Sequence, residues 1–513
     1  MVKLTIATGA QLVTVAIGLL GLIIILRAVI FFPTPPDPVD CRQQSNHTSI
    51  DNTDGRLVNR FIRALRFRTI TRAPQVYDSQ EIKLFIEFLN KSFPAVHTSP
   101  SIGLTIINEH SLLYHIRGSD PSLKPYLLLA HMDVVPAEED KWHSPPYDGT
   151  VRPDGYIYGR GTVDLKDVLM GILESLEFLA ETRHQFRRSF YVAIGHDEEG
   201  RGLDGARQTA SYLRNSGVTE FEYILDEGPF ILERVIMGTS RSVAMIGVTE
   251  KGFVNVRLTA NGKVGHSSVP PPETSIVALS RAVAKFTAYT HPNQFGRGPE
   301  RQLIESIAPY ATFAYKLLYA NLWLFGPLVS RLMETDNTMN SFIRTSTAVT
   351  MFKSGVKDNI LPGDASATVN HRIYPLSSVR EVLEFDRQLI ADDDRIQVEI
   401  LGVPIEPHPI SPRNRFGYQV IRESIREVFP QVVVIPGVML AATDTRWFLN
   451  FTRNIYRFSP AIIPREDMDR FHGHDERISV DNYVKLVNFY HHIIIGSDDS
   501  SHRGFSSLAK DEL

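Results

Sequence analysis

Residues 126–133 read Tyr-Leu-Leu-Leu-Ala-His-Met-Asp, a short apolar run that ends in a histidine and an aspartate. Similar runs at 190–194 and 221–225 are followed by His196-Asp-Glu-Glu199 and by Asp226-Glu227. Short apolar runs bounded by polar residues are typical of strands that are buried on both faces of a parallel sheet. The sequence therefore predicts a sheet whose strands deliver histidine and carboxylate side chains at their ends.

Helical patterns lie between and after these runs. Apolar residues from Val168 to Leu179 recur at helical spacing and indicate a crossover helix, so we expect an α/β domain with a mixed, mostly parallel sheet. The pattern changes near residue 242, where strands with one solvated face combine with two helices. The second helix opens with a capping box of Ser378 and Glu381. These features predict an inserted α+β domain before the α/β pattern returns.

The N-terminal 32 residues are strongly apolar and are followed by a proline-rich stop at Pro33, Pro35 and Pro36. About 20 apolar residues suffice to cross a bilayer, and this segment exceeds the core of a typical cleaved signal peptide. Three readings stay open: a retained membrane anchor, a signal peptide and a buried helix of a soluble protein. The predicted parts are the signal anchor or signal peptide (1–32), a stalk (33–55), the α/β domain in two pieces (56–241 and 404–495), the inserted domain (242–403) and a tail (496–513).

The last four residues, Lys510-Asp-Glu-Leu513, match the retrieval address of the endoplasmic reticulum. Together with an N-terminal export segment they predict a protein of the reticulum lumen or membrane, or an extracellular one if the address is not read. Asn46, Asn90 and Asn450 lie in N-x-S/T sequons and are candidate glycosylation sites there. The single cysteine, Cys41, is either an inert thiol or half of an intermolecular disulfide.

Composition narrows the function classes. The 54 Lys and Arg residues against 58 Asp and Glu give a net charge of −4, which argues against a nucleic-acid binder. The content of 43% apolar and 22% charged residues excludes disordered, collagen-like and coiled-coil proteins. Residues 300–335 are unusually apolar and aromatic. They form either helices packed on the inserted sheet or a surface that receives an acyl chain or rests on a membrane.

Because the carboxyl ends of parallel strands meet at one edge of a sheet, we expect the polar residues that follow the three runs to lie together. Asp164, after a glycine-rich turn, and His472 are further candidates. So many carboxylates at one place require neutralising cations. A pair of divalent ions with a shared carboxylate and an open position for water fits such a set. Asp133 would orient His131, and one residue of Glu198-Glu199 would act as general base.

The motifs His131-x-Asp133, Asp164-x-Lys166, Glu198-Glu199, Asp226 and His472 resemble, in order and approximate spacing, those of the M20 dizinc metallopeptidases, the family of carboxypeptidase S and aminoacylase. The strings at 157–166 (IYGRGTVDLK) and 472–479 (HGHDERIS) look like the vertebrate branch that acts on N-fatty-acyl amino acids. The resemblance covers residues 55–495 approximately and implies a catalytic α/β domain with an inserted lid and dimerisation domain.

The resemblance also implies a role for each matched residue. Two Zn²⁺ ions would be held by the bridging Asp164, by His131 and Asp226 at one site, and by Glu199 and His472 at the other. Glu198 would be the general base and His266 a lid residue that reaches the reacting carbonyl. The implied substrate-binding residues are Arg372, Asn359, Thr443 and Asp444.

Three functions follow from these patterns. The leading hypothesis is a zinc-dependent amidohydrolase. The resemblance implies that it hydrolyses N-fatty-acyl amino acids and, in reverse, forms them from a free fatty acid and an amino acid. The first alternative is a zinc carboxypeptidase or dipeptidase that acts on small peptides. The second is a non-catalytic lumenal protein that binds lipids. In the first two cases the partner is a small-molecule substrate, with a membrane anchor and a homodimer formed through the lid as further expectations.

Overall fold

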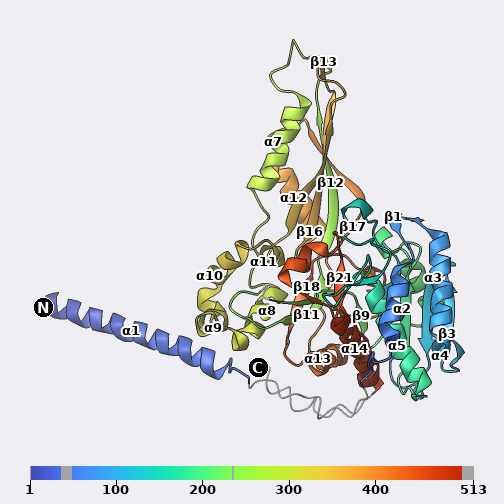
Figure 1. Cartoon of the computed structure of the whole chain (residues 1–513). Helices are drawn as coiled ribbons and strands as arrows, with labels where there is room; N and C mark the ends of the chain where they lie inside the picture. The colour runs from blue at the N-terminus through green and yellow to red at the C-terminus, as the bar shows by residue number, and fades with distance from the viewer. Residues whose placement is uncertain (1, 36–48, 234–235, 499–513) are drawn as a thin grey trace. The chain divides into compact units, whose positions relative to one another are not determined.

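The computed structural model describes residues 2–35, 49–233 and 236–498 (Figure 1). The described residues form two compact units. Unit 1 comprises residues 2–35, 249–410 and 436–442, and unit 2 comprises residues 49–233, 236–248, 411–435 and 443–498. The predicted features at Cys41, Asn46 and Lys510–Leu513 lie outside the described residues.

Unit 2 is built on a ten-stranded mixed sheet. Nine strands follow the order β20-β10-β11-β19-β9-β5-β8-β4-β3, and the tenth, β18, pairs with β11. Pairing is parallel at the centre, from β19 through β9 and β5 to β8, and antiparallel toward β3 and β11. The strands are β3 (Ile102–Ile107), β4 (Ser111–Ile116), β5 (Tyr126–His131), β8 (Phe190–Gly195), β9 (Ile224–Asp226), β10 (Ile231–Leu232), β11 (Val243–Glu250), β18 (Val433–Met439), β19 (Ile455–Arg457) and β20 (Ile462–Ile463). The predicted α/β class is confirmed.

One predicted strand is shorter than expected. The apolar run at 221–225 begins as a loop, and β9 starts only at Ile224. The backbone N–H groups of Phe221 and Glu222 donate to the carbonyls of Phe451 and Pro125, at 3.2 and 2.7 Å, so these two residues are satisfied outside the β9 ladder. Apolar character marks the buried segment here, whereas the hydrogen bonds set where the strand begins.

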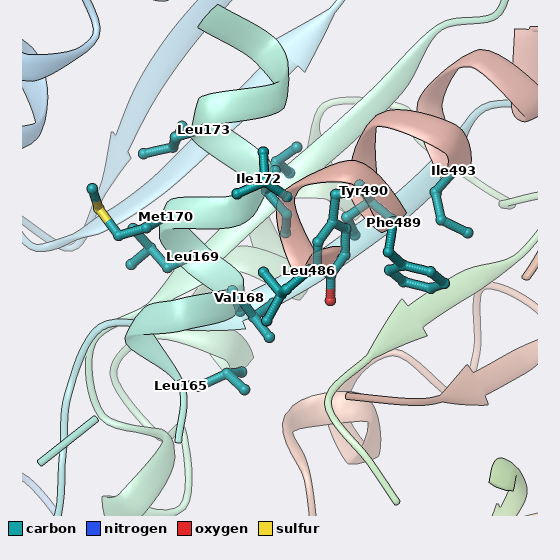
Figure 2. Close-up of a cluster of buried hydrophobic side chains, with 14 of the residues drawn as sticks. Leu165, Val168, Leu169, Met170, Ile172, Leu173, Leu486, Phe489, Tyr490 and Ile493 are labelled. Carbon is teal, nitrogen blue, oxygen red and sulfur yellow. The ribbon is translucent and has the colours of Figure 1, made fainter. Parts of the chain in front are cut away.

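Helices cover this sheet, and two of them form the centre of the core. The crossover helix is α5 (Lys166–Glu181), as predicted, and it packs on α14 (Val480–Asp498). Figure 2 shows Val168 and Ile172 of α5 facing Leu486 and Tyr490 of α14. A Cβ on Gly171 would overlap the Leu486 side chain, so glycine permits the close approach of the two helices. The helix begins at Lys166, two residues after Asp164.

Five further α-helices and two small sheets belong to the described part of unit 2. The helices are α2 (Arg56–Leu65), α3 (Ser79–Ser92), α4 (Pro94–Thr98), α6 (Ala206–Asn215) and α13 (Phe416–Val428). Two small sheets join β1 (Thr71–Ala73) to β2 (Val76–Tyr77), and β21 (Arg477–Ser479) to β7 (Tyr156–Tyr158) and β6 (Thr150–Val151). The pairing of β21 with β7 brings the loop after residue 158 next to the segment before residue 477.

Unit 1 contains an antiparallel sheet of order β14-β16-β12-β17, with α7 and α12 packed against it (Figure 1). Side chains alternate between buried and partly exposed along β12 and β16, which is the pattern of a sheet with one covered face. The predicted capping box is present, because Ser378 and Glu381 exchange side-chain and backbone hydrogen bonds. The elements are β12 (Gly252–Asn261), β14 (Ser346–Ser354), β16 (Asp364–Ile373), β17 (Ile396–Ile405), α7 (Ser275–Ala288) and α12 (Val379–Leu389).

The apolar segment 300–335 forms α8 (Pro299–Ile307), α9 (Phe313–Ala320) and α10 (Leu322–Glu334), followed by α11 (Asn337–Phe342). The hydrophobic core under the four-stranded sheet is formed with α7 and α12. The helices α8 to α11 contact one another in sequence order, and α9 also contacts α1 (Val2–Ile30). Within α1, residues 11–30 have a mean hydropathy of 2.7 and are long enough to cross a membrane. A signal sequence has the same properties.

Candidate active site

Three parallel strands bring their carboxyl ends to one edge of the sheet in unit 2. β5 lies between β8 and β9, and His131 at the end of β5 is in register with Gly195 at the end of β8. Glu198 and Glu199 follow β8 in a short 3₁₀ helix, Glu198–Gly200. The side chains that the sequence placed at strand ends therefore gather at this edge, as expected for an open α/β sheet.

Asp164 reaches the same place through a loop that a buried glutamate organises. The carboxylate of Glu476 accepts hydrogen bonds from the backbone N–H groups of Gly161 and Val163, at 3.1 and 2.8 Å, and pairs with Arg160 at 2.7 Å. Glu476 is fully buried, so an unmade bond here would leave a costly desolvated group. Glu476 was not recognised from the sequence, although it lies two residues after His474 in a quoted motif.

The carboxylate of Asp164 is shared by two histidines. Its Oδ1 lies 3.1 Å from Nε2 of His131 and its Oδ2 lies 2.7 Å from Nε2 of His472. Glu227 Oε1 lies 3.8 Å from the His131 nitrogen, and Glu199 Oε1 lies 3.5 Å from the His472 nitrogen. Two overlapping ligand groups result, His131–Asp164–Glu227 and Asp164–Glu199–His472, each with its ligand atoms within 4.8 Å of one another.

Asp133 orients both halves of the site. His131 Nδ1 lies 3.0 Å from the backbone carbonyl of Asp133 and 3.3 Å from its Oδ1. The same carboxylate accepts the backbone N–H groups of Glu198 and Glu199 at 3.1 and 3.2 Å. A hydrogen bond at Nδ1 fixes the ring so that Nε2 faces the ligand group. One buried aspartate thus positions His131 and the two glutamates together.

The charges in this cluster are unbalanced. Burial and the neighbouring Asp164 charge raise the pKa of Glu199 to about 7 and raise that of Glu227 well above its usual range. Burial, followed by the charge of Asp444, does the same to the pKa of Glu198. Burial would raise the pKa of Asp164 as well, but hydrogen bonds from His131 and His472 lower it. Nearby divalent cations remove the cost of holding these carboxylates ionised, and oxygen and imidazole donors suit zinc.

The predicted substrate-side residues Thr443 and Asp444 lie at the edge of this cluster. Both are buried, and a Cβ on Gly195 or Gly202 would crowd the Asp444 carboxylate. Arg446, which follows in the same 3₁₀ helix, places Nη2 3.1 Å from Oε1 of Glu198. Arg446 was not identified from the sequence, and no local pattern distinguishes it from other arginines.

The remaining predicted substrate residues belong to unit 1. His266 is exposed in β13 (Gly265–His266), which pairs with β15 (Ile360–Leu361), and Asn359 accepts the backbone N–H of Ser267 at 3.1 Å. Arg372 lies in β16, with its guanidinium 5.0 Å from the ring centre of Phe253. The structure therefore brings His266 and Asn359 together, and their substrate roles stay predictions. The sequons at Asn90 and Asn450 are exposed, and their glycosylation is likewise a prediction.

A third histidine cluster in unit 1 has a different character. His371 Nε2 lies 3.0 Å from Oδ2 of the fully buried Asp386, and His291 lies near them. Burial, together with the charges of His371, Lys251 and Arg344, lowers the pKa of His291 to about 3. Neighbouring cationic side chains oppose a metal ion here, so we interpret the cluster as a buried structural contact between His371 and Asp386.

The first ligand group differs from the sequence-based assignment at one residue. The resemblance implied Asp226, but within the described residues the carboxylate that the structure groups with His131 and Asp164 is that of Glu227. Asp226 Oδ1 instead accepts the backbone N–H of Glu227 at 2.8 Å. Successive side chains of a strand point to opposite faces, and Asp226 is the last residue of β9. The ligand role of Asp226 stays a prediction, and Glu227 is a second candidate.

This difference leads to a direct test. We expect Glu227→Gln to remove about one zinc ion per chain, because a neutral amide is a poor zinc ligand. Asp226→Asn should retain more metal than Glu227→Gln, since its carboxylate bonds to the backbone. Metal analysis of the two purified variants after dialysis against a weak chelator makes the comparison. A larger loss from Asp226→Asn would return the ligand role to Asp226.

A carboxylate shared by two histidine-containing ligand groups at the edge of an α/β sheet is an arrangement suited to metal-assisted hydrolysis. Residues 127–496 match the sequence profile of Peptidase family M20/M25/M40, so the chain belongs to this family and is a metal-dependent hydrolase of amide bonds.

Two curated relatives and one solved structure are similar to the chain over most of its length. The N-fatty-acyl-amino acid synthase/hydrolase PM20D1 of Xenopus tropicalis is 41% identical over 498 residues, covering 96% of each chain. The probable carboxypeptidase S-like 2 of Dictyostelium discoideum is 40% identical over 448 residues, covering 86% of this chain and 85% of the relative. The M20 family metallo-carboxypeptidase Sso-CP2 of Sulfolobus solfataricus shares the fold, with a TM-score of 0.64, 18% identity and coverage of 86% and 99%.

Proposed function

We propose that this chain is a zinc-dependent amidohydrolase that hydrolyses N-fatty-acyl amino acids and, in reverse, forms them from a fatty acid and an amino acid. The observation that carries the proposal is the position of Asp164 between His131 and His472, with Glu198 in the same buried cluster. The name of the Xenopus relative supports the substrate class. Net direction follows the concentrations of the reactants, because catalysts accelerate both directions.

The proposed ligands are His131, Asp164 and Glu227 for one Zn²⁺, with Asp226 as the sequence-based alternative to Glu227. Asp164, Glu199 and His472 would hold the other, with Asp164 as the bridge. When bound, the two ions would polarise the amide carbonyl and lower the pKa of a shared water toward about 7. The fit rests on the donor set and on the buried excess of carboxylates described above.

Glu198 is the proposed general base. It takes a proton from the attacking water and delivers it to the departing amine nitrogen, a pair of transfers that one positioned carboxylate performs in turn. Arg446 holds Oε1 of Glu198 at 3.1 Å, and Asp133 holds the backbone N–H of the same residue. These two contacts limit the motion of the carboxylate, so that proton transfer starts from one defined position.

The proposed roles of unit 1 rest on the resemblance. His266 would stabilise the oxyanion, an electrostatic contribution often worth about 3 kcal/mol. Arg372 and Asn359 would bind the carboxylate of the amino acid, since an arginine fork meets a carboxylate through two hydrogen bonds. A homodimer formed through this unit belongs to the same proposal.

We also propose that the chain enters the secretory pathway through α1 and stays attached to the membrane by it. The length and hydropathy of residues 11–30 support an anchor, because about 20 apolar residues cross a bilayer. The active site would then face the lumen, where a lipid-like substrate reaches it from the same membrane.

The first alternative, a carboxypeptidase or dipeptidase, keeps the same chemistry and is supported by the name of the Dictyostelium relative. The two are separated by assaying the full chain, purified in detergent with zinc, against N-oleoyl-phenylalanine and a panel of apolar dipeptides. The proposal expects release of oleate and phenylalanine, and the reverse condensation at high concentrations of both. Turnover confined to the dipeptides would overturn the lipid substrate, and binding of acyl ligands without any turnover would favour the lipid-binding alternative.

A further inference from the structure

The helices α9 and α10 of unit 1 leave an apolar face uncovered. Phe313 at the start of α9 is 60% exposed, and Trp323 and Leu328 of α10 are 54% and 48% exposed. In α10 the exposed positions Trp323, Leu324, Pro327 and Leu328 recur at helical spacing, so they form one continuous face. Exposed apolar faces of this kind mark binding surfaces.

Polar contacts join this pair of helices to the end of α1. Asn321, between α9 and α10, donates from Nδ2 to the backbone carbonyl of Ile24 at 3.1 Å. Arg27 donates from Nε to the carbonyl of Ala320 at 2.8 Å, and Lys316 donates from Nζ to Oγ1 of Thr34 at 2.8 Å. Figure 1 shows the C-terminal end of α1 beside α9. The apolar face is therefore held next to the point where the candidate membrane span ends.

We propose that the exposed face of α10, with Phe313 of α9, lies in the interface of the bilayer that α1 spans and forms a second membrane contact. This inference rests on the proposed membrane attachment through α1. Its occupant is the lipid surface itself, because the hydrogen bonds of Asn321, Arg27 and Lys316 hold α9 and the start of α10 beside the end of the candidate membrane span.

The depth of the contact agrees with an interfacial helix. Ile24 lies six residues before the end of α1 at Ile30, which is about 9 Å at a rise of 1.5 Å per residue. Amphipathic interfacial helices insert their apolar face to about 5–10 Å. Tryptophan favours this level of a membrane, and Trp323 is exposed on the face. The exposed Arg331, two turns after Leu324, is placed to reach lipid headgroups.

Such a contact has a functional consequence. A long-chain N-acyl amino acid dissolves in a membrane far better than in water, so an enzyme held by two contacts takes its substrate from the bilayer. The face thereby determines which pool of substrate the enzyme meets, while the chemistry stays in unit 2.

Site-specific fluorescence tests the inference in the full chain reconstituted into phosphatidylcholine vesicles. In a chain whose single cysteine is replaced (Cys41→Ser), Leu328→Cys carries an environment-sensitive fluorophore. Vesicles containing phosphatidylcholine with brominated acyl chains should quench this probe. The matched control is Val277→Cys, an exposed apolar position of α7 in the same unit, which should keep its fluorescence. Equal quenching at both positions, or none at Leu328, would overturn the inference.

A third probe at Leu19→Cys, in the middle of α1, separates this inference from the proposed attachment. Quenching at Leu19 without quenching at Leu328 would leave the anchor in place and remove the second contact. Quenching at neither position would contradict both the membrane anchor and the second contact. Disulfide cross-linking between two Leu328→Cys chains in the membrane would show that a second copy covers the face, and quenching only by a brominated N-acyl amino acid would show that substrate does. Either result would also overturn the bilayer contact.

Discussion

A Glu198→Gln enzyme is expected to lose about 10²–10⁴-fold in kcat, the usual contribution of a positioned general base, while it keeps its metal. The substitution retains the volume of the side chain and an oxygen that can accept from Arg446 Nη2. It removes the ability to take up a proton. Because Glu198 lies outside the two ligand groups, the zinc content should stay near that of the wild type.

Three measurements on one preparation make this prediction sharp: kcat on N-oleoyl-phenylalanine, zinc per chain and the thermal unfolding midpoint. Glu87→Gln is the matched control, since this exposed glutamate of α3 makes only an exposed ion pair with Lys91, and its activity should be unchanged. Activity close to wild type in Glu198→Gln would assign the base to another residue. Loss of zinc together with activity would place Glu198 among the ligands.

The sequence predicted most of the fold because its signals were local. The apolar run at 126–131 ends in His131, and the helical period from Val168 to Leu179 follows Asp164, so both ligands could be placed on named elements. The capping box at Ser378 specified the start of α12 for the same reason. Each of these features depends on residues within a single element, and the structure contains them as predicted.

The parts that the sequence did not predict depend on contacts between distant segments. Glu227 Oε1 comes within 3.8 Å of His131 Nε2 directly after β9, a strand whose start is set by hydrogen bonds to distant loops. Arg446 meets Glu198 across 248 positions of sequence, and Glu476 reaches the loop at Gly161 across 315. A single sequence contains no local pattern that pairs such residues.

The apolar segment 300–335 illustrates a different limit. Its composition predicted helices, but could not say which face of each helix would be covered. In the structure Val329 and Met333 of α10 are buried, whereas Trp323 and Leu328 on the same helix are exposed. The hydrophobic pattern of α10 therefore exceeds what its own unit buries, and this excess supports the membrane contact proposed above.

Loss of the shared carboxylate should have the largest effect of any single substitution. Asp164 belongs to both ligand groups and contacts His131 and His472 through different oxygens. Asp164→Asn should therefore weaken the binding of both ions at once. Bound metal contributes several kcal/mol to the transition state, and each 1.36 kcal/mol is tenfold in rate, so activity should fall by at least about 10⁴-fold. In contrast to Glu198→Gln, the zinc content should fall with it.

The control for Asp164→Asn is Asp140→Asn, which removes an exposed carboxylate of unit 2 and should change neither activity nor metal content. Circular dichroism establishes that the variants are folded, and Asp164→Glu serves as a second variant, because it keeps the charge but shifts the carboxylate by one methylene group. We expect Asp164→Glu to bind more zinc than Asp164→Asn and to remain slow, since a bridge must reach both sites in one geometry. If folded Asp164→Asn retained both ions and its activity, the cluster would not be built around this residue, and the mechanism proposed for Glu198 would lose its site.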